Sequence, residues 1–191
     1  MTWTAGWWSA ARRCASPNFS ARPDATLVSL ALIHSISLPP GQFGGDAIER
    51  LFDNHLDWDA HPYYAQIRGM EVSSHFLVRR DAALLQFVSC DERAWHAGTS
   101  QWRGRDNCND FSIGIELEGL EGESFEPAQY LALAELLRSL AQRYPLSAVA
   151  GHEHVAQGRK LDPGAGFEWP CLVAALGWPD QYCPEMVTKR I

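Results

Sequence analysis

The sequence lacks the features that mark several common classes of protein. Its 191 residues contain only five cysteines, and no two of them form a Cys-X-X-Cys pair. An odd, scattered set of cysteines is a poor disulfide framework, and without such a pair a thiolate zinc finger is not indicated either. We therefore expect reduced, mostly structural cysteines at Cys14, Cys90, Cys108, Cys171 and Cys183.

Positive charge and long apolar runs are also scarce. Lys and Arg number 16 against 23 Asp and Glu, which gives a formal net charge of −7. Binding to nucleic acid needs a basic face that neutralises phosphates, so we expect no nucleic-acid partner. No apolar run approaches the roughly 18–20 residues that span a bilayer, so we expect no membrane association. The first residues, MTWTAGWWSAARR, place their arginines last, unlike a secretory signal, and we expect a cytoplasmic protein.

Internal repeats and low-complexity linkers are missing as well, so the chain is expected to form one domain over residues 1–191. Domains usually have about 100–200 residues, and this length fits one of them. The composition, 46% apolar and 20% charged, is typical of a globular protein and excludes a disordered one.

Strands alternate with helices along the chain, which predicts an α/β fold. An uninterrupted apolar run is typical of a strand buried on both faces, while strict alternation predicts two different faces. Strands are predicted at 27–33 (LVSLALI), at 112–118 (SIGIELE), at 146–150 (LSAVA) and in a hairpin over 75–88 that turns at Arg80-Asp81. Helices are predicted from Asp46, as the cap, to Asp53, from Pro127 to about Tyr144, and at 169–176. We expect a sheet covered on both faces, to which the hairpin adds an antiparallel part.

Three side chains stand where a catalytic metal site could form. His34 follows the first apolar run, His152 follows LSAVAG, and Asp162 lies in the tight loop GRKLDPG. Sites form outside the carboxyl ends of strands in open α/β sheets, and two His nitrogens with one carboxylate leave the fourth position of zinc to water. Each His alone is more often a hydrogen-bonded core residue. His154 also competes with His152, and the spacing alone does not separate them.

Two further residues could take part in the chemistry of such a metal site. Strand alternation places Glu116 on the polar face, where a carboxylate could accept a proton from water. The alternative is that Glu116 and Glu118 are solvated acids on an exposed sheet face. Lys160 lies two residues before Asp162 and could stabilise negative charge on an attacked carbonyl, although a solvent-facing lysine is the simpler interpretation.

The segment 91–110 is long for a connection inside a compact domain, and loops of this length are usually functional. Trp95 and His96 offer flat faces for sugar rings, and Arg105 offers donors for carboxylates. Packing in the protein interior is the alternative for the tryptophan. His75, on a predicted hairpin strand, is expected to be a core residue instead of a ligand.

Several stretches of the sequence match the motifs of one family in the right order. They are LALIHSISLPPGQFGG, DAHPYYAQI, VSSHFLVRRD, RAWHAG, NCNDFSIGIELEG and GHEHVAQGRKLDPG. Together they resemble the cytoplasmic 1,6-anhydro-N-acetylmuramyl-L-alanine amidases over about residues 12–178. The resemblance implies the fold of phage lysozyme-like amidases and peptidoglycan recognition proteins, a central mixed sheet flanked by helices.

The resemblance also implies roles for individual residues. It assigns the zinc ligands to His34, His152 and Asp162, and so selects His152 over His154. It assigns the catalytic acid to Glu116 and the lysine of the site to Lys160.

Two positions depart from the family pattern and are expected to contact substrate. Ser35 stands where relatives often carry Asn, and Asn107 stands where some carry Arg. The details of substrate affinity depend on both.

The resemblance implies a zinc amidase of peptidoglycan recycling. Such enzymes cleave the amide between the lactyl group of N-acetylmuramic acid and L-alanine in small anhydromuropeptides. In bacteria with an inducible chromosomal β-lactamase, they also lower the muropeptide signal that induces it. We expect a monomer with Zn²⁺ as cofactor. Two alternatives are a non-catalytic module that senses peptidoglycan and an extracytoplasmic amidase that acts on the intact wall.

Overall fold

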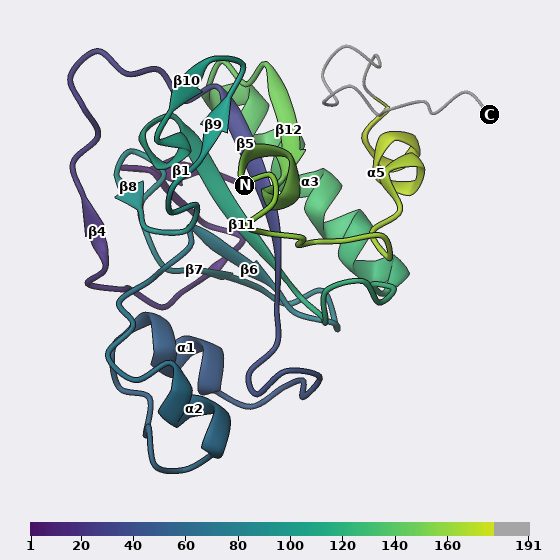
Figure 1. Cartoon of the computed structure of the whole chain (residues 1–191). Coiled ribbons are helices and arrows are strands. Elements are labelled where there is room, and N and C mark those ends of the chain that lie inside the picture. Colours follow the sequence, from purple (N-terminus) through teal and green to yellow (C-terminus); the bar gives the residue numbers. More distant parts are fainter. Residues whose placement is uncertain (178–191) are drawn as a thin grey trace.

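The computed structural model describes residues 1–177 of the chain, and Figure 1 shows the arrangement of its elements. The four cysteines of this part are free, as predicted, whereas Cys183 and the tail lie outside the described residues. Within residues 1–177, no helix is both long enough and apolar enough to cross a membrane.

A six-stranded sheet forms the centre of the fold. Its order is β12 (Ala148–Gly151), β5 (Leu30–Ile36), β11 (Ser112–Glu118), β6 (Phe76–Val78), β7 (Leu84–Gln86) and β3 (Arg12–Arg13). The strands from β12 to β6 pair in parallel, and β7 pairs antiparallel with β6. The sheet is therefore mixed, as predicted, and the hairpin contributes its antiparallel part.

One prediction about the strands is wrong in detail, and one of the alternatives is excluded. Strand β5 extends to Ile36 because it pairs with β11 along its whole length, so His34 lies inside the strand and does not follow it. All seven residues of β11 are buried, so its polar residues do not face solvent. Glu118 is only 2% exposed and accepts a hydrogen bond from Arg79 Nη1 at 2.7 Å.

Helices α3 (Pro127–Arg143) and α5 (Trp169–Leu176) cover one face of the sheet (Figure 1). Apolar side chains of this face, such as Ile33 and Ile115, pack with Leu133 and Leu137 of α3 in one buried cluster. Both helices agree with their predicted positions. Gly177 ends α5 with a left-handed backbone (φ 63°), the usual conformation after a helix.

Short elements cover the opposite face. Helices α1 (Ala47–Phe52) and α2 (Pro62–Gln66) pack beside β7, and one turn of helix, α4 (His152–Val155), follows β12. The segment 91–110 contains β8 (Arg93–Ala94), β9 (Gln101–Trp102), β10 (Arg105–Asp106) and the 3-10 turn η1 (Cys108–Asp110). The N-terminal segment contains β4 (Phe19–Ser20), together with β1 (Trp3–Thr4) and β2 (Trp7–Trp8), whose Trp3 and Trp8 pack instead in the cluster on the α3 side.

The predicted cap of α1 is not formed by its side chain. Asp46 occupies the N-terminal position, but its carboxylate accepts a hydrogen bond from Arg50 Nε at 2.6 Å instead of from the helix backbone. The helix begins there all the same, because Ile48, Leu51 and Phe52 are buried.

Candidate metal centre

Strand register brings the predicted site residues to one level of the sheet. His34 on β5 is the direct neighbour of Glu116 on β11, and Gly151, the last residue of β12, is the neighbour of Ile33. His152 therefore follows β12 at the level of His34. Neighbours in a parallel ladder point to the same face, so His34 and Glu116 share the face opposite α3.

The side chains of His34, His152 and Asp162 meet at one point. The two Nδ1 atoms are 3.0 Å apart, and Asp162 Oδ2 lies 3.2 Å from His34 Nδ1 and 3.1 Å from His152 Nδ1. The exposed fractions of the three residues are 2%, 3% and 7%. The loop after α4 is fixed to the helix, since Glu153 N donates to the backbone oxygen of Asp162 at 2.9 Å. The three residues form a group able to hold a metal ion.

The chemistry of this group fits a divalent cation. Three atoms bound tetrahedrally at about 2.0–2.2 Å from zinc lie about 3.3–3.6 Å apart, slightly more than the observed spacing of 3.0–3.2 Å. His152 Nε2 lies 3.0 Å from the backbone oxygen of Ala97, which can only accept a hydrogen bond. A neutral His152 therefore carries its proton on Nε2 and directs the lone pair of Nδ1 toward the carboxylate of Asp162. A cation between them removes this repulsion.

The protonation states are those that metal ligands require. Burial lowers the pKa of His34 from 6.5 to about 4, although its contact with Asp162 opposes the shift. Burial alone would raise the pKa of Asp162, but its contacts with the ring nitrogens of His152 and His34 outweigh burial and lower that pKa. At neutral pH the site thus offers a neutral imidazole at His34 and an ionised carboxylate.

His154 lies outside this group, so the geometry favours His152 over His154. Its Nδ1 accepts a hydrogen bond from Gly151 N at 2.8 Å, and its ring packs edge-on against Trp169. It borders a separate open groove of about 820 Å³, which it shares with Trp102.

Glu116 and Lys160 line the same cavity as the three clustered residues. The cavity has a volume of about 330 Å³. Glu116 is 8% exposed, and burial together with Asp162 raises its pKa well above 4.5, against the opposing charge of Lys160. Lys160 is exposed at the edge. The interpretation of Glu116 as a solvated acid is therefore wrong, and its carboxyl can hold a proton at the cavity wall.

Of the five predicted substrate contacts, three line this cavity: Ser35, Trp95 and His96. The hydroxyl of Ser35 is buried without a hydrogen-bond partner among residues 1–177. His96 differs, because both of its ring nitrogens already contact protein atoms.

The structure does not place the other two predicted contacts, Arg105 and Asn107, at the cavity lining found within residues 1–177. Arg105 stacks on the ring of Phe111 at 3.8 Å and donates to Ser29 Oγ. Asn107 has a left-handed backbone (φ 57°) and precedes η1. Their positions follow from the local path of the segment 91–110, which sequence spacing does not reveal.

The sequence did not predict the groups that contact the cluster residues, or their neighbours His96 and Ala97, on the side away from the metal position. They are the backbone oxygen of Ala97 and the side chains of Asn109 and Ser112. A backbone oxygen has no signature in a sequence, and Asn109 and Ser112 act on neighbouring protein groups. Tyr63 also lines the cavity, and in the sequence it is marked only as part of the motif DAHPYYAQI.

Comparisons with known proteins agree with this geometry. A family model described as N-acetylmuramoyl-L-alanine amidase matches residues 25–165, a range that includes all three clustered residues. The chain is 50% identical over 167 residues to the 1,6-anhydro-N-acetylmuramyl-L-alanine amidase AmpD of Salmonella typhimurium strain SL1344, covering 86% of this chain and 89% of the relative. A crystal structure of a selenomethionine derivative of AmpD superposes with a TM-score of 0.88 at 46% identity, covering 92% of this chain and 99% of the other.

A second solved structure contains a ligand. It is the Escherichia coli N-acetylmuramyl-L-alanine amidase AmiD in complex with the substrate anhydro-N-acetylmuramic acid-L-Ala-D-γ-Glu-L-Lys. It has a TM-score of 0.58 and 31% identity, over 81% of this chain and 60% of that chain. On the family match and on the extent of identity, this chain belongs to the N-acetylmuramoyl-L-alanine amidase family.

Proposed function

We propose that this chain is a zinc amidase that cleaves the bond between the lactyl group of 1,6-anhydro-N-acetylmuramic acid and L-alanine in peptidoglycan recycling. The observation that carries the proposal is the convergence of His34 Nδ1, His152 Nδ1 and Asp162 Oδ2 within 3.2 Å of one another beside a cavity. The identity to amidases named for this substrate supports the choice of bond.

The metal that we assign to the cluster is Zn²⁺. Two imidazole nitrogens and one carboxylate oxygen form the ligand pattern of catalytic zinc, which keeps one position open. When bound, zinc supplies Lewis-acid activation of water and of the amide carbonyl.

The remaining steps belong to residues of this chain. Glu116 accepts the proton of the attacking water on its carboxyl group and delivers a proton to the departing L-alanine nitrogen. The raised pKa of Glu116 suits this exchange, because a group whose pKa lies nearer the working pH can both accept and donate. Lys160 approaches from the cavity edge and stabilises the negative charge on the attacked carbonyl oxygen.

We assign substrate contacts to Ser35 and Trp95. The Ser35 hydroxyl can exchange a hydrogen bond with a polar substrate group, since it has no protein partner among the described residues. Trp95 lies half-buried at the cavity wall and offers a flat apolar face to a sugar ring.

A small muropeptide, in place of a polymer, is the proposed substrate. The substrate printed for the AmiD complex is such a fragment, and a cavity of about 330 Å³ lies within the usual range for small ligands. We further propose that the chain acts as a monomer with one catalytic domain, in the cytoplasm, where such recycling takes place.

An amide-release assay with soluble anhydromuropeptide tests the proposal, with intact wall sacculi as the competing substrate and metal content measured in parallel. We expect release from the soluble fragment by the zinc-loaded wild type. We expect Glu116→Gln to retain zinc and to lose a factor of about 10²–10⁴ in kcat.

Each contrary result favours a specific alternative. Zinc bound without any release would favour a module that senses peptidoglycan. Faster release from sacculi than from the soluble fragment would favour an amidase of the intact wall. An active Glu116→Gln variant would refute the role of that carboxyl.

A further inference from the structure

We infer that the dipeptide His96-Ala97 is a positioning element that fixes the ring tautomers of His34 and His152 and thereby sets the affinity of the cluster for its metal. The inference rests on the proposed metal site. It assigns to His96 a positioning role in place of the substrate contact expected from the sequence.

The contact of Ala97 with His152 is the simpler half of this element. The backbone oxygen of Ala97 lies 3.0 Å from His152 Nε2 and can only accept, so the ring must carry its proton there. Arg159 Nη2 donates to the same oxygen at 2.6 Å and to Thr99 O at 2.6 Å, which holds this turn of the backbone in place. The result is a lone pair on His152 Nδ1, directed at the cluster.

His96 fixes His34 through a chain of hydrogen bonds with one consistent direction. Ser112 Oγ donates its single proton to Cys108 O at 2.6 Å, so it can only accept from His96 Nε2, 3.3 Å away. With its proton on Nε2, a neutral His96 has a lone pair on Nδ1, which accepts from His34 Nε2 at 3.0 Å. His34 is thereby left with a lone pair on Nδ1, the atom that lies in the cluster.

Gly114 on β11 provides the space for the ring of His96. A Cβ atom at Gly114 would lie 2.5 Å from His96 Cγ and 2.6 Å from its Nδ1, so any other residue would displace the ring. The ring stands nearly perpendicular to His34, with centroids 5.1 Å apart. This arrangement directs the lone pair of His96 Nδ1 at His34.

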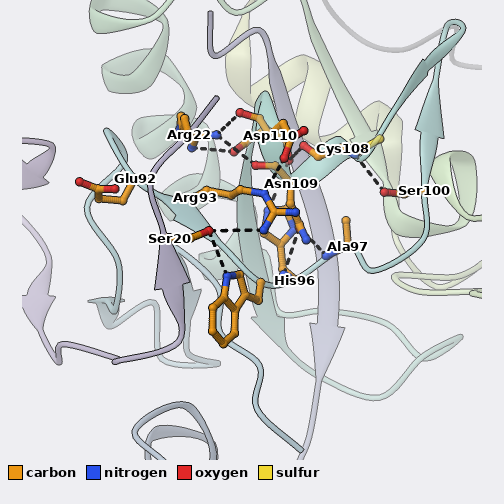
Figure 2. Close-up of polar contacts among 12 residues, drawn as sticks. Ser20, Arg22, Glu92, Arg93, His96, Ala97, Ser100, Cys108, Asn109 and Asp110 are labelled. Atoms are coloured by element: carbon orange, nitrogen blue, oxygen red, sulfur yellow. Dashed lines mark hydrogen bonds and ion pairs between the residues drawn. The ribbon is translucent and has the colours of Figure 1, made fainter. Parts of the chain in front are cut away.

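The side chain of Asn109 fixes the backbone of the dipeptide by hydrogen bonds. Its Oδ1 accepts from the backbone N–H of His96 at 3.2 Å and from that of Ala97 at 2.8 Å (Figure 2). Asn109 is 6% exposed and comes from η1, the same turn that supplies Cys108 O. One turn thus fixes both the backbone of the dipeptide and the acceptor at the end of the His96 chain.

Outer partners of this kind select the tautomer of a metal-bound histidine, and their loss commonly weakens metal binding by about 10–100-fold. Both nitrogens of His96 are occupied in this role. A substrate would have to break one of these hydrogen bonds to use the ring as a donor or acceptor.

Chelator competition with zinc as the probe tests the inference on the full chain. We expect His96→Phe, which removes the acceptor for His34, to bind zinc about 10–100-fold more weakly than the wild type. His96→Asn can place its amide oxygen where Nδ1 was and is expected to recover most of this loss. The melting temperature of each metal-free variant reports any general loss of stability.

Two glycine variants provide a matched comparison that leaves every hydrogen-bonding side chain intact. Gly114→Ala displaces the His96 ring and is expected to weaken zinc binding by at least tenfold. Gly119→Ala introduces a similar close contact, with the ring of Phe125 in the α3-side core, and is expected to leave zinc affinity unchanged.

Nitrogen NMR of the metal-free wild type gives a result that needs no variant. We expect neutral His34 and His152 to carry their protons on Nε2. Protons on Nδ1 of either ring, or wild-type zinc affinity in both His96→Phe and Gly114→Ala, would overturn the inference while leaving the amidase proposal intact. A different result would contradict the proposed function alone. In that case His34 and His152 carry their protons on Nε2 and the two variants bind zinc more weakly, but the zinc-loaded wild type releases no amide product.

Discussion

The side chains of His34, His152 and Asp162 converge because the backbone places them at the same point. His34, His152 and Asp162 could be predicted because each stands at or near a strand end or in a tight loop, positions with a known tendency to form sites. The position of Arg105 could not be predicted in the same way. Its stacking on Phe111 depends on the folded path of the segment 91–110, and this path depends on contacts with distant residues.

His75 shows how a buried histidine differs from a ligand. It is fully buried, its Nδ1 accepts from Gly114 N at 3.0 Å, and its Nε2 lies 3.1 Å from Glu92 O. Burial, with the nearby charge of Arg22, lowers its pKa from 6.5 to about 3. The prediction that His75 is a core residue is confirmed by its burial.

The pH dependence of stability follows from this lowered pKa. Between pH 6.5 and 3, His75 takes up a proton in the unfolded chain but not in the folded one, so stability is lost as the pH falls. The free energy of unfolding falls by about 1.4 kcal/mol per pH unit well below pH 6.5 because of this group. Urea unfolding of the metal-free proteins at pH 7, 6 and 5 measures this effect. The free energy of unfolding of the wild type, relative to that of His75→Gln, should fall as the pH decreases. Parallel pH profiles for the two proteins would contradict the assignment.

Among the helices and strands, those with a strong local pattern were predictable. Helix α3 has its buried stripe at three- and four-residue spacing, and the β6–β7 hairpin has apolar strands around a polar turn. The extent of β5 was not, because its end is set by pairing with β11. The short strands of the segment 91–110 have two residues each, too few for any period to show.

Strand β11 is anchored at its end by a buried ion pair. Glu118 accepts from Arg79 Nη1 at 2.7 Å, from Gly44 N at 2.7 Å and from Arg80 N at 3.2 Å. The loop between β5 and α1 is thereby tied to the sheet. Arg79 also donates to Glu49 at 2.9 Å, so this pair is part of a small network.

Removal of the Glu118 charge should therefore destabilise the fold strongly. Breaking one partner of a buried pair typically costs about 3–5 kcal/mol, and we expect Glu118→Gln to lie near the lower end because Glu49 remains. Asp46→Asn removes one partner of the exposed pair with Arg50 and should change stability little. Urea unfolding of both variants distinguishes these cases, and equal losses would contradict the structural role of Glu118.

For the molecule as a whole, the metal would join parts of the chain that are far apart in sequence. His34 comes from the sheet centre, His152 from the start of α4 and Asp162 from the loop beyond it. A ligand that binds only the folded state stabilises it, by about 4 kcal/mol when its free concentration is 1,000 times its Kd. We therefore expect a chelator to lower the melting temperature, and zinc to restore it. A melting temperature that changes neither with the chelator nor with zinc would argue against a metal held in the folded protein.

Which histidine completes the site can be decided by counting zinc in three proteins prepared side by side. We predict about one zinc per chain in the wild type and in His154→Ala, because His154 Nδ1 accepts from Gly151 N outside the cluster. We predict that His152→Ala loses the metal. Zinc retained by His152→Ala, or lost from His154→Ala, would contradict the ligand set of His34, His152 and Asp162.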